Sequence, residues 1–333
     1  MKAVIPVAGI GSRLRPHTHT QPKALVPVAG KPILAHIVDP LIAAGIKDFV
    51  FIIGYMGSKI EEYIYHTYKK KNLKFEFVVQ EPREGIAHAL WLVKNHIKDE
   101  KEILITLGDV IIDIDLKKIL ASKNSILGIK KVDTPGNFGI AELDEEGNIT
   151  RLVEKPKIPK SNLALIGIYK ITNPKLLVSS ISHIIKNNIK TIGEYQLTDA
   201  LMRMVEKGEK ISTLVVDNWF DCGRKESLLE ANAILMGRDS FKSSKNTYHK
   251  TIIVEPVSIG KNCNISNSII GPYVALGDNA TVSYSIVKNT IIGSYSELQS
   301  AVLHSSVIGS DTSLRGLSHS LNIGDNTDIK FSG

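Results

Sequence analysis

The sequence predicts an α/β domain followed by a parallel β-helix, and three observations lead to this fold class. Over the first 236 residues, short apolar segments rich in β-branched residues alternate with amphipathic helical segments, which is the order of elements in βαβ units. Residues 237–250 are polar and have no hydrophobic period, as expected of a linker. Beyond them, Ile-Gly and Leu-Gly pairs recur at short intervals, and such a repeat is typical of a solenoid. We therefore expect a first domain at 1–236, a linker at 237–251 and a β-helix at 252–333.

The first domain is expected to hold one sheet, mixed but mainly parallel, with helices on both faces. Its elements are expected in this order: strands near 2–7, 48–53, 75–79 and 103–107 with helices near 33–45, 58–68 and 85–97 between them, a β-rich stretch at 126–171, helices near 174–187 and 196–206, a strand near 211–216 and a helix near 225–236. Pro40 falls inside the first helical segment, where its missing N–H and its ring should kink the helix or divide it in two. The later strands are expected to extend the same sheet and to cover the mouth of a site at the carboxyl ends of the parallel strands.

The repeat near the C-terminus has the spacing of a hexapeptide-type β-helix. Pairs of an aliphatic residue and a glycine stand at Ile259-Gly260, Ile270-Gly271, Leu276-Gly277, Ile292-Gly293, Ile308-Gly309 and Ile323-Gly324. Further aliphatic residues lie between these pairs, at Ile265, Val282, Val287, Leu298, Leu303 and Leu314. Three steps of this spacing make one turn of about 16 residues, in which each aliphatic side chain points into a triangular prism and each glycine turns a corner. The repeat is long enough for roughly four or five turns, and an ordinary β-sandwich would not repeat a residue pair at this interval.

Composition excludes several classes of protein. The chain has 333 residues, a net charge of +7 and a pI of about 9.1. Its lysine and arginine residues alternate with acidic ones, which indicates a solvated surface with an anion site rather than a nucleic-acid-binding stripe. Two cysteines, Cys222 and Cys263, and no leader peptide before the first strand favour a cytoplasmic protein. No apolar run approaches the roughly 20 residues of a membrane-spanning helix, so we expect neither a nucleic-acid nor a membrane partner.

The loop after the first strand, AGIGSRLRPHTHTQPKALVPVAGKP at residues 8–32, has the composition of a triphosphate site. Gly9 and Gly11 let backbone N–H groups approach a polyanion without hindrance from a Cβ atom. Arg13 and Lys23 supply positive charge. The loop lacks the spacing of the ATPase phosphate loop, and a leucine stands where the dinucleotide fingerprint would need its third glycine.

Two aspartates are candidate Mg²⁺ ligands. Asp109 ends the apolar segment ILITLGD, at the edge of the sheet where ligands bind, and a carboxylate there needs solvent or a metal ion. Asp221 lies in WFDCG, after two aromatic residues and before a glycine. Two carboxylates with phosphate oxygens and water complete the octahedral shell that Mg²⁺ prefers. An isolated aspartate is also typical of a turn or a helix cap.

The opening loop and four later fragments resemble the sugar-1-phosphate nucleotidyltransferases, also called nucleotide-sugar pyrophosphorylases. The loop matches their signature G-x-G-[ST]-R-[LM]-x-P, followed by P-K-x-[LM]-x-P-V and K-P. The later fragments follow in the family's order: QEPREGIAHA at 80–89, LGD at 107–109, EKP at 154–156 and WFDCG at 219–223. The resemblance runs from Lys2 to about Met236 and continues into the repeat. It therefore implies a Rossmann-like nucleotidyltransferase domain with the left-handed β-helix that many long-form members carry.

The resemblance implies a role for each matching residue. Arg13 would contact the departing pyrophosphate, Lys23 would bridge phosphates near the reacting phosphorus, and Lys155 would hold the phosphate of the sugar. Asp109 and Asp221 would bind Mg²⁺. Two further sets would bind the nucleotide (Ala8, Gly9, Gly11, Ser12, Gln80, Gly85, Ala87 and Gly108) and the sugar hydroxyls (Gly139 and Glu154), with Gln80 reading the base.

The implied reaction needs no protein nucleophile and no general base. A sugar 1-phosphate oxygen, already an anion, attacks the α-phosphorus of a nucleoside triphosphate in line, and pyrophosphate leaves on the opposite side. Catalysis consists of bringing two polyanions together and neutralising their repulsion. The pattern is most similar to long-form glucose-1-phosphate thymidylyltransferases, which favours dTTP and glucose 1-phosphate. The segment Pro6-Val7-Ala8-Gly9 is more similar to the corresponding segment of uridylyltransferases, so UTP is an alternative nucleotide. A mannose-1-phosphate guanylyltransferase is a further alternative.

Other functions are compatible with parts of the sequence. β-Helices of this repeat also form acyltransferases with a histidine base between coils, and His304 and His319 lie in the repeat. Roughly four or five turns without a long inserted loop is short for such a site. A non-catalytic homologue that binds nucleotide sugars could dispense with the loop cations and the two aspartates, but this chain has them all. The β-helix, a stiff prism with an open edge, is expected to make the chain a homo-oligomer.

Overall fold

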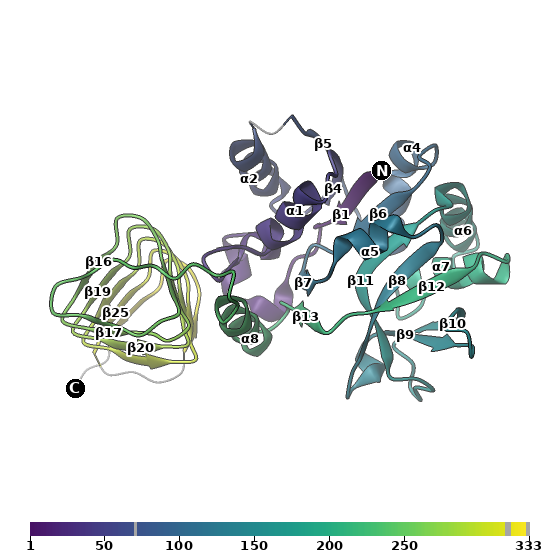
Figure 1. Cartoon of the computed structure of the whole chain (residues 1–333). Helices are drawn as coiled ribbons and strands as arrows, with labels where there is room; N and C mark the ends of the chain where they lie inside the picture. The colour runs from purple at the N-terminus through teal and green to yellow at the C-terminus, as the bar shows by residue number, and fades with distance from the viewer. Residues whose placement is uncertain (70–71, 317–320, 331–333) are drawn as a thin grey trace. The chain divides into compact units, whose positions relative to one another are not determined.

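The computed structural model describes residues 1–69, 72–316 and 321–330, and Figure 1 shows the course of the chain. The chain divides into two compact units: the first holds Met1–Gly9 and Ile37–Trp219, and the second holds Ile10–His36 and Phe220–Gly333. Most of the opening loop therefore belongs to the same unit as the β-helix. The predicted boundaries at residues 236 and 252 separate domains that would each fold independently, which is a different property from compactness. These boundaries stay a prediction.

The first unit is built on a nine-stranded mixed sheet (Figure 1). Its strands are β1 (Lys2–Pro6), β4 (Asp48–Ile53), β5 (Lys74–Val79), β6 (Ile103–Thr106), β8 (Ser125–Lys131), β9 (Gly139–Leu143), β10 (Ile149–Glu154), β11 (Leu163–Ile171) and β12 (Ile211–Val215). They follow the order β10-β9-β11-β6-β1-β4-β5, with β8 also beside β11 and β12 beside β8. β1 runs parallel to β4 and β6, and β4 parallel to β5, whereas β11 is antiparallel to β6, β8 and β9. The predicted Rossmann-like α/β fold, with later strands extending the sheet, is confirmed.

Both faces of this sheet are buried. Alternate residues of a strand point to opposite faces, so Val4, Val50 and Ile105 share a core with residues of helices on one side. On the other side Phe51 stacks on Phe77 with 5.3 Å between ring centroids, beside a tyrosine of α2. The helices are α1 (Ile33–Ala43), α2 (Gly57–Tyr68), α3 (Ile86–Leu92), α4 (Lys94–Ile97), α5 (Leu116–Ala121), α6 (Pro174–Lys186), α7 (Leu197–Glu206) and α8 (Lys225–Met236). In the part of the chain that the structure describes, none of them has the length and apolar character to cross a bilayer.

Short elements lie in the connections of both units. They are the 3₁₀ helices η1 (Ser12–Leu14), η2 (His17–His19), η3 (Lys23–Leu25) and η4 (Pro135–Asn137), and the strands β2 (Pro27–Val28), β3 (Lys31–Pro32), β7 (Val110–Asp113) and β13 (Asn218–Asp221). η1, η2 and η3 fall in the opening loop, which is therefore a series of tight turns rather than an extended segment.

Two predicted helices differ in their course. α1 is not divided at Pro40 but continues to Ala43, because the proline removes a single backbone donor and its own carbonyl still accepts a hydrogen bond from Ala44 N at 2.9 Å. The helix predicted at 85–97 is two helices, because Val93, with φ of −97° and ψ of 13°, ends α3 before α4 begins.

The second unit contains the predicted β-helix, whose strands form three parallel sheets (Figure 1). The sheets are β14 (Ile252–Ile253), β17 (Ile269–Ile270), β20 (Ile286–Lys288) and β23 (Val302–His304); β15 (Val257–Ile259), β18 (Val274–Leu276), β21 (Ile291–Ile292), β24 (Val307–Ile308) and β26 (Asn322–Ile323); and β16 (Asn264–Ser266), β19 (Thr281–Ser283), β22 (Glu297–Gln299), β25 (Ser313–Arg315) and β27 (Asp328–Lys330). The aliphatic residues predicted to fill the prism are buried in one core, except Ile259, which is partly buried. Three parallel sheets around an aliphatic core are consistent with the predicted left-handed β-helix.

Apart from Gly271, which has φ of 107°, the glycines of the predicted pairs are needed for a different reason from the predicted one. Gly277 and Gly293 do not adopt positive φ; the left-handed residue follows two positions later, at Asn279 and Tyr295, each with φ of 60°. A Cβ atom on Gly293 would instead lie 2.4 Å from Ser310 N, a backbone atom of the next coil. The glycine therefore allows successive coils to stack closely, and the residue after next turns the corner.

This stacking makes the replacement of Gly293 by alanine a test of the β-helix. We expect the free energy of unfolding to fall by about 2–3 kcal/mol, because the added methyl group overlaps backbone that cannot move without separating two coils. The control is Gly237→Ala at the end of α8, where φ is −75° and an added Cβ lies 3.3 Å from its nearest neighbour. Urea denaturation of both variants decides: equal losses of stability would contradict the stacking role of Gly293.

Candidate active site

The opening loop is shaped around Gly11. This residue has φ of 70°, in the left-handed region that favours glycine. A Cβ atom on it would lie 2.9 Å from the Cβ atom of Lys23, so the turn and the lysine are packed together. Thr18 Oγ1 donates to the carbonyl of Gly11 at 2.8 Å and closes the turn from the other side. Ser12 and Arg13 follow in η1, which places the arginine directly beyond the turn.

Within the second unit, Asp221 lies beside both predicted loop cations. Its carboxylate oxygens are 3.9 Å from an Nη atom of Arg13 and 3.8 Å from Nζ of Lys23. The Lys23 side chain is 10% exposed and that of Arg13 is 56% exposed, so the lysine is held in place while the arginine can reorient. Gly223 makes this approach feasible, since a Cβ atom there would lie 2.8 Å from Asp221 Oδ1. The structure thus brings together three of the predicted site residues.

In the first unit, Gly108 packs against the end of β1, just before Ala8 and Gly9, and Asp109 follows Gly108 in the chain. Gly108 N donates to Pro6 O at 3.1 Å, and a Cβ atom on Gly108 would lie only 2.1 Å from a methyl carbon of the residue after Pro6, so only glycine fits there. Among the described residues, a Cβ atom on Gly9 would meet nothing within 4 Å. Packing therefore explains Gly108, while the approach of a ligand to Gly9 stays a prediction.

Gln80 follows β5 at the same edge of the sheet. It is 6% exposed, and its backbone N donates to Ile53 O at 2.8 Å. Its side-chain Nε2 donates to Gly85 O at 2.9 Å. Gly85 has φ of 103°, and a Cβ atom on it would lie 2.5 Å from Tyr195 O, so the turn after Gln80 also requires glycine. Ala87 follows in α3, and its side chain is fully buried in the core, so a contact of this residue with the base stays a prediction.

Glu154 and Lys155 form the predicted sugar-phosphate end of the site, in the first unit. Thr198 Oγ1 donates to Glu154 Oε2 at 2.6 Å, and Lys155 Nζ lies 3.6 Å from Glu154 Oε1. Gly139 leaves room for this arrangement, because a Cβ atom there would lie 2.8 Å from Glu154 Oε2. Burial, then the negative charges of Glu154 and Asp109, raise the pKa of Tyr169. Tyr169 is therefore close enough to be affected by the charge of Glu154, a predicted sugar-binding residue, and by that of Asp109, a predicted Mg²⁺ ligand.

Two residues beside Glu154 are not among the predicted site residues. Thr198 and Asp199 lie in the first turn of α7, where an acidic or hydroxyl side chain is common and so carries no separate signal. Thr198 instead orients Glu154. Burial raises the pKa of Asp199, which accepts a hydrogen bond from Thr191 Oγ1 at 2.8 Å. The signal in the sequence that could have pointed to Thr198 is Gly139, because a glycine at this position indicates that other side chains pack closely against it.

The predicted Mg²⁺ ion would be bound by few protein groups. Within the described ranges, no group of three or more His, Cys, Asp and Glu side chains is placed to hold a metal ion. The two predicted ligands, Asp109 and Asp221, offer hard carboxylate oxygens, which fit Mg²⁺. A site with so few protein ligands depends on water and substrate phosphates for the rest of its shell, as is usual for Mg²⁺.

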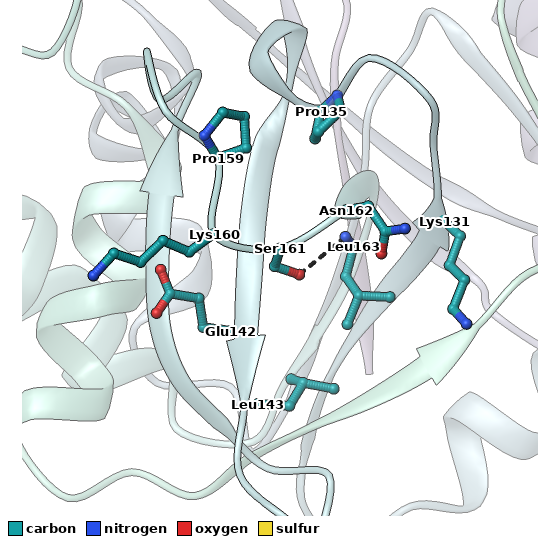
Figure 2. A pocket seen from close by; sticks show the side chains of 9 residues that line it. All are labelled: Lys131, Pro135, Glu142, Leu143, Pro159, Lys160, Ser161, Asn162 and Leu163. Carbon is teal, nitrogen blue, oxygen red and sulfur yellow. Dashed lines mark hydrogen bonds between the residues drawn. The ribbon is translucent and has the colours of Figure 1, made fainter.

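A separate hollow of about 880 Å³ is bordered by the ends of β8 and β9 and by the start of β11. Figure 2 shows its lining, with Lys160 near Glu142 on one side and the backbone N of Leu163 bonded to Ser161 Oγ at 3.1 Å. None of the predicted site residues lines it. The hollow is therefore distinct from the candidate active site.

His17, buried at the start of η2, gives the second unit a pH dependence. Burial lowers the pKa of His17, while its hydrogen bond with Asn322 and the charge of Asp325 act in the opposite direction. Below pH about 6.5 the unfolded chain binds a proton that the folded chain excludes. We therefore expect the free energy of unfolding to fall as the pH drops from about 6.5 towards the lowered pKa. Urea denaturation at several pH values should give a flatter profile for His17→Gln; an identical profile would contradict this source of the pH dependence.

Comparison with known proteins places the chain in a family. Three curated relatives illustrate the range of names. The Haloferax volcanii low-salt glycan biosynthesis nucleotidyltransferase Agl11 is 32% identical over 88% of this chain and 87% of its own length. The Methanococcus vannielii bifunctional protein GlmU is 32% identical over 91% of this chain and 73% of its own. A Streptomyces griseus glucose-1-phosphate thymidylyltransferase is 29% identical over 88% and 87%.

A solved structure supports the same relationship. The structure of a UDP-glucose pyrophosphorylase complexed with UDP-glucose has a TM-score of 0.61 and 26% identity, and the match covers 70% of this chain and 97% of that one. Residues 2–237 match the family described as nucleotidyl transferase. The resemblance found in the sequence is confirmed: the chain belongs to the nucleotidyl transferase family.

Proposed function

We propose that this chain transfers a thymidylyl group from dTTP to glucose 1-phosphate, which yields dTDP-glucose and pyrophosphate. Its family makes it a nucleotidyltransferase. The finer assignment is supported by the Streptomyces griseus glucose-1-phosphate thymidylyltransferase, which matches over 88% of the chain. The observation that carries the proposal is the convergence of Arg13 and Lys23 on Asp221, at 3.9 and 3.8 Å, in the loop predicted to receive a triphosphate.

The loop residues would act on the phosphates. Arg13 presents a planar fork of donors that suits the oxygens of the departing pyrophosphate. Lys23 is a fixed point charge near the reacting phosphorus, and its burial strengthens its attraction for phosphate. Mg²⁺ held by Asp109 and Asp221 would, when bound, neutralise phosphate charge. The attacking oxygen of the sugar phosphate is already an anion, so these residues need only position and neutralise, and no residue has to remove a proton.

The residues of the first unit would select the substrates. Because Nε2 of Gln80 donates to Gly85 O, the amide oxygen of Gln80 is the group that can accept the N3–H of a pyrimidine base. Thymine and uracil share this N–H, so UTP is the alternative nucleotide. Glu154, oriented by Thr198, would accept hydrogen bonds from sugar hydroxyls, and Lys155 would hold the sugar phosphate.

A pyrophosphate-release assay tests both substrates. The common nucleoside triphosphates are each combined with glucose, mannose, galactose and glucosamine 1-phosphates and Mg²⁺. We expect the highest kcat/KM for dTTP with glucose 1-phosphate. A preference for UTP would make the chain a uridylyltransferase, and GTP with mannose 1-phosphate would make it a guanylyltransferase. No release with any pair would point to a non-catalytic homologue.

The β-helix needs an assay of its own, because one relative is named a bifunctional protein. His304 of β23 is exposed on an outer face, and His319 lies outside the described residues. We expect no acetyl transfer from acetyl-CoA to glucosamine 1-phosphate, since His304 does not line the hollow of about 510 Å³ that Ile269 and Tyr284 border on the β-helix. A homo-oligomer and a cytoplasmic location stay predictions, and light scattering at micromolar concentration checks the first.

A further inference from the structure

The last coil of the β-helix meets the opening loop, and this contact continues the stacking of the coils. Inside the repeat, Gly277, Gly293 and Gly309 each face the backbone of the next coil; a Cβ atom on Gly309 would lie 2.4 Å from the carbonyl carbon of Gly324. At Gly324 the facing atoms belong to Pro16, whose Cβ would lie 2.7 Å from an added Cβ. Pro16 of the loop therefore occupies the place that a further coil would take at this corner.

Two polar contacts flank this packing. The ring of His17 is hydrogen-bonded to Asn322 Oδ1, and Thr20 Oγ1 donates to Asp325 Oδ2. Asp325 is also tied to the coil beneath, because its Oδ1 accepts from Ser310 N at 2.7 Å. Since His17 begins η2 and Thr20 follows its end, the coil holds this short helix from both sides.

The held segment is the one that shapes the candidate phosphate site. Thr18, between the two anchored residues, donates to Gly11 O at 2.8 Å. Leu14 N donates to the same carbonyl at 2.9 Å and closes the turn that carries Arg13. Lys23 packs against Gly11. A shift of η2 would therefore move the turn and both cations.

The far end of the loop is anchored in the same unit. Ala29 N donates to Asn232 Oδ1 at 2.9 Å, and Asn232 Nδ2 donates to Tyr273 O at 3.0 Å. Asn232 is fully buried, so this bridge from the loop through α8 to the β-helix is shielded from water. The loop is thus held at two places, and the contact with the last coil is the one next to the cations.

We propose that Asn322 and Asp325 are positioning residues for the nucleoside triphosphate, because they hold the loop that presents Arg13 and Lys23. This inference rests on the proposed function and gives the β-helix a part in the reaction. The effect should fall on the nucleotide rather than on the sugar phosphate, since the held loop carries Arg13 and Lys23, which are assigned to the triphosphate, and none of the predicted sugar residues.

Matched variants test the proposal on the full chain. Thr20→Val removes the hydroxyl and Thr20→Ser keeps it. Asp325→Ala removes the anchor, and Asp278→Ala is its control, because Asp278 Oδ1 accepts from Lys261 N at 2.7 Å in the same corner of an earlier coil. We expect Thr20→Val and Asp325→Ala each to raise the KM for dTTP about tenfold. The KM for glucose 1-phosphate should stay within about twofold, and Thr20→Ser and Asp278→Ala should behave as wild type.

Two outcomes would overturn the proposal: Asp325→Ala no different from Asp278→Ala, or KM values for both substrates rising together. A readout independent of activity is trypsin cleavage after Arg13, which is exposed. If the coil holds the loop, cleavage should be several times faster in Thr20→Val and Asp325→Ala than in their controls. If wild type releases no pyrophosphate with any substrate pair, the proposed function fails. In that case only the trypsin cleavage rates decide whether the coil holds the loop. Equal rates in Asp325→Ala and Asp278→Ala would show that it does not.

Discussion

Replacement of Asp221 by alanine is expected to lower kcat for pyrophosphate release by at least about 100-fold in a protein that remains folded. The carboxylate lies 3.9 Å from Arg13 and 3.8 Å from Lys23. Its loss removes a predicted Mg²⁺ ligand and the group that sets the spacing of the two cations. Steady-state rates at saturating dTTP, glucose 1-phosphate and Mg²⁺ measure the effect, and circular dichroism checks the fold.

The matched control is Asp217→Ala, an exposed carboxylate four positions earlier. It should keep wild-type kcat, because an exposed surface substitution leaves the site intact. Asp109→Ala is expected to lose as much activity as Asp221→Ala, since both are predicted to bind the same ion. Near-normal turnover in either variant at saturating Mg²⁺ would contradict the metal assignment.

The sheet and the interior of the β-helix could be predicted because local patterns determine them. Short apolar segments such as residues 48–53 become buried strands wherever they pair, and the spacing of aliphatic residues fixes which side chains fill the prism. Parallel strands share one carboxyl edge, so the positions of Gly108 and Gln80 after β6 and β5 followed from chain order alone.

Other features depend on contacts between distant residues and could not be predicted. The packing of Pro16 on Gly324 joins positions that no local pattern relates. The break at Val93 in the helix predicted at 85–97 follows from its backbone angles, while the sequence around it keeps a helical period. Thr198 resembles an ordinary helix start, and only its bond to Glu154 marks it as part of the site.

Replacement of Lys155 by methionine is expected to raise the KM for the sugar 1-phosphate about 30-fold, from the loss of one charge-assisted bond to phosphate. Lys155 has φ of 40°, an unusual conformation for a residue with a side chain. The hydrogen bond from its backbone N to Phe138 O at 2.9 Å helps to hold that conformation. Such strain persists at sites where a side chain must be aimed.

Methionine has nearly the same length and the same Cβ atom, so it keeps the strain and loses only the charge. Lys157→Met removes an exposed lysine two positions later and serves as the control. We expect the KM for the nucleotide to stay within about twofold in both variants, because Lys155 is assigned to the sugar phosphate alone. If Lys155→Met raised the KM for the nucleotide instead, the lysine would act on the triphosphate, and its assignment to the sugar phosphate would be wrong.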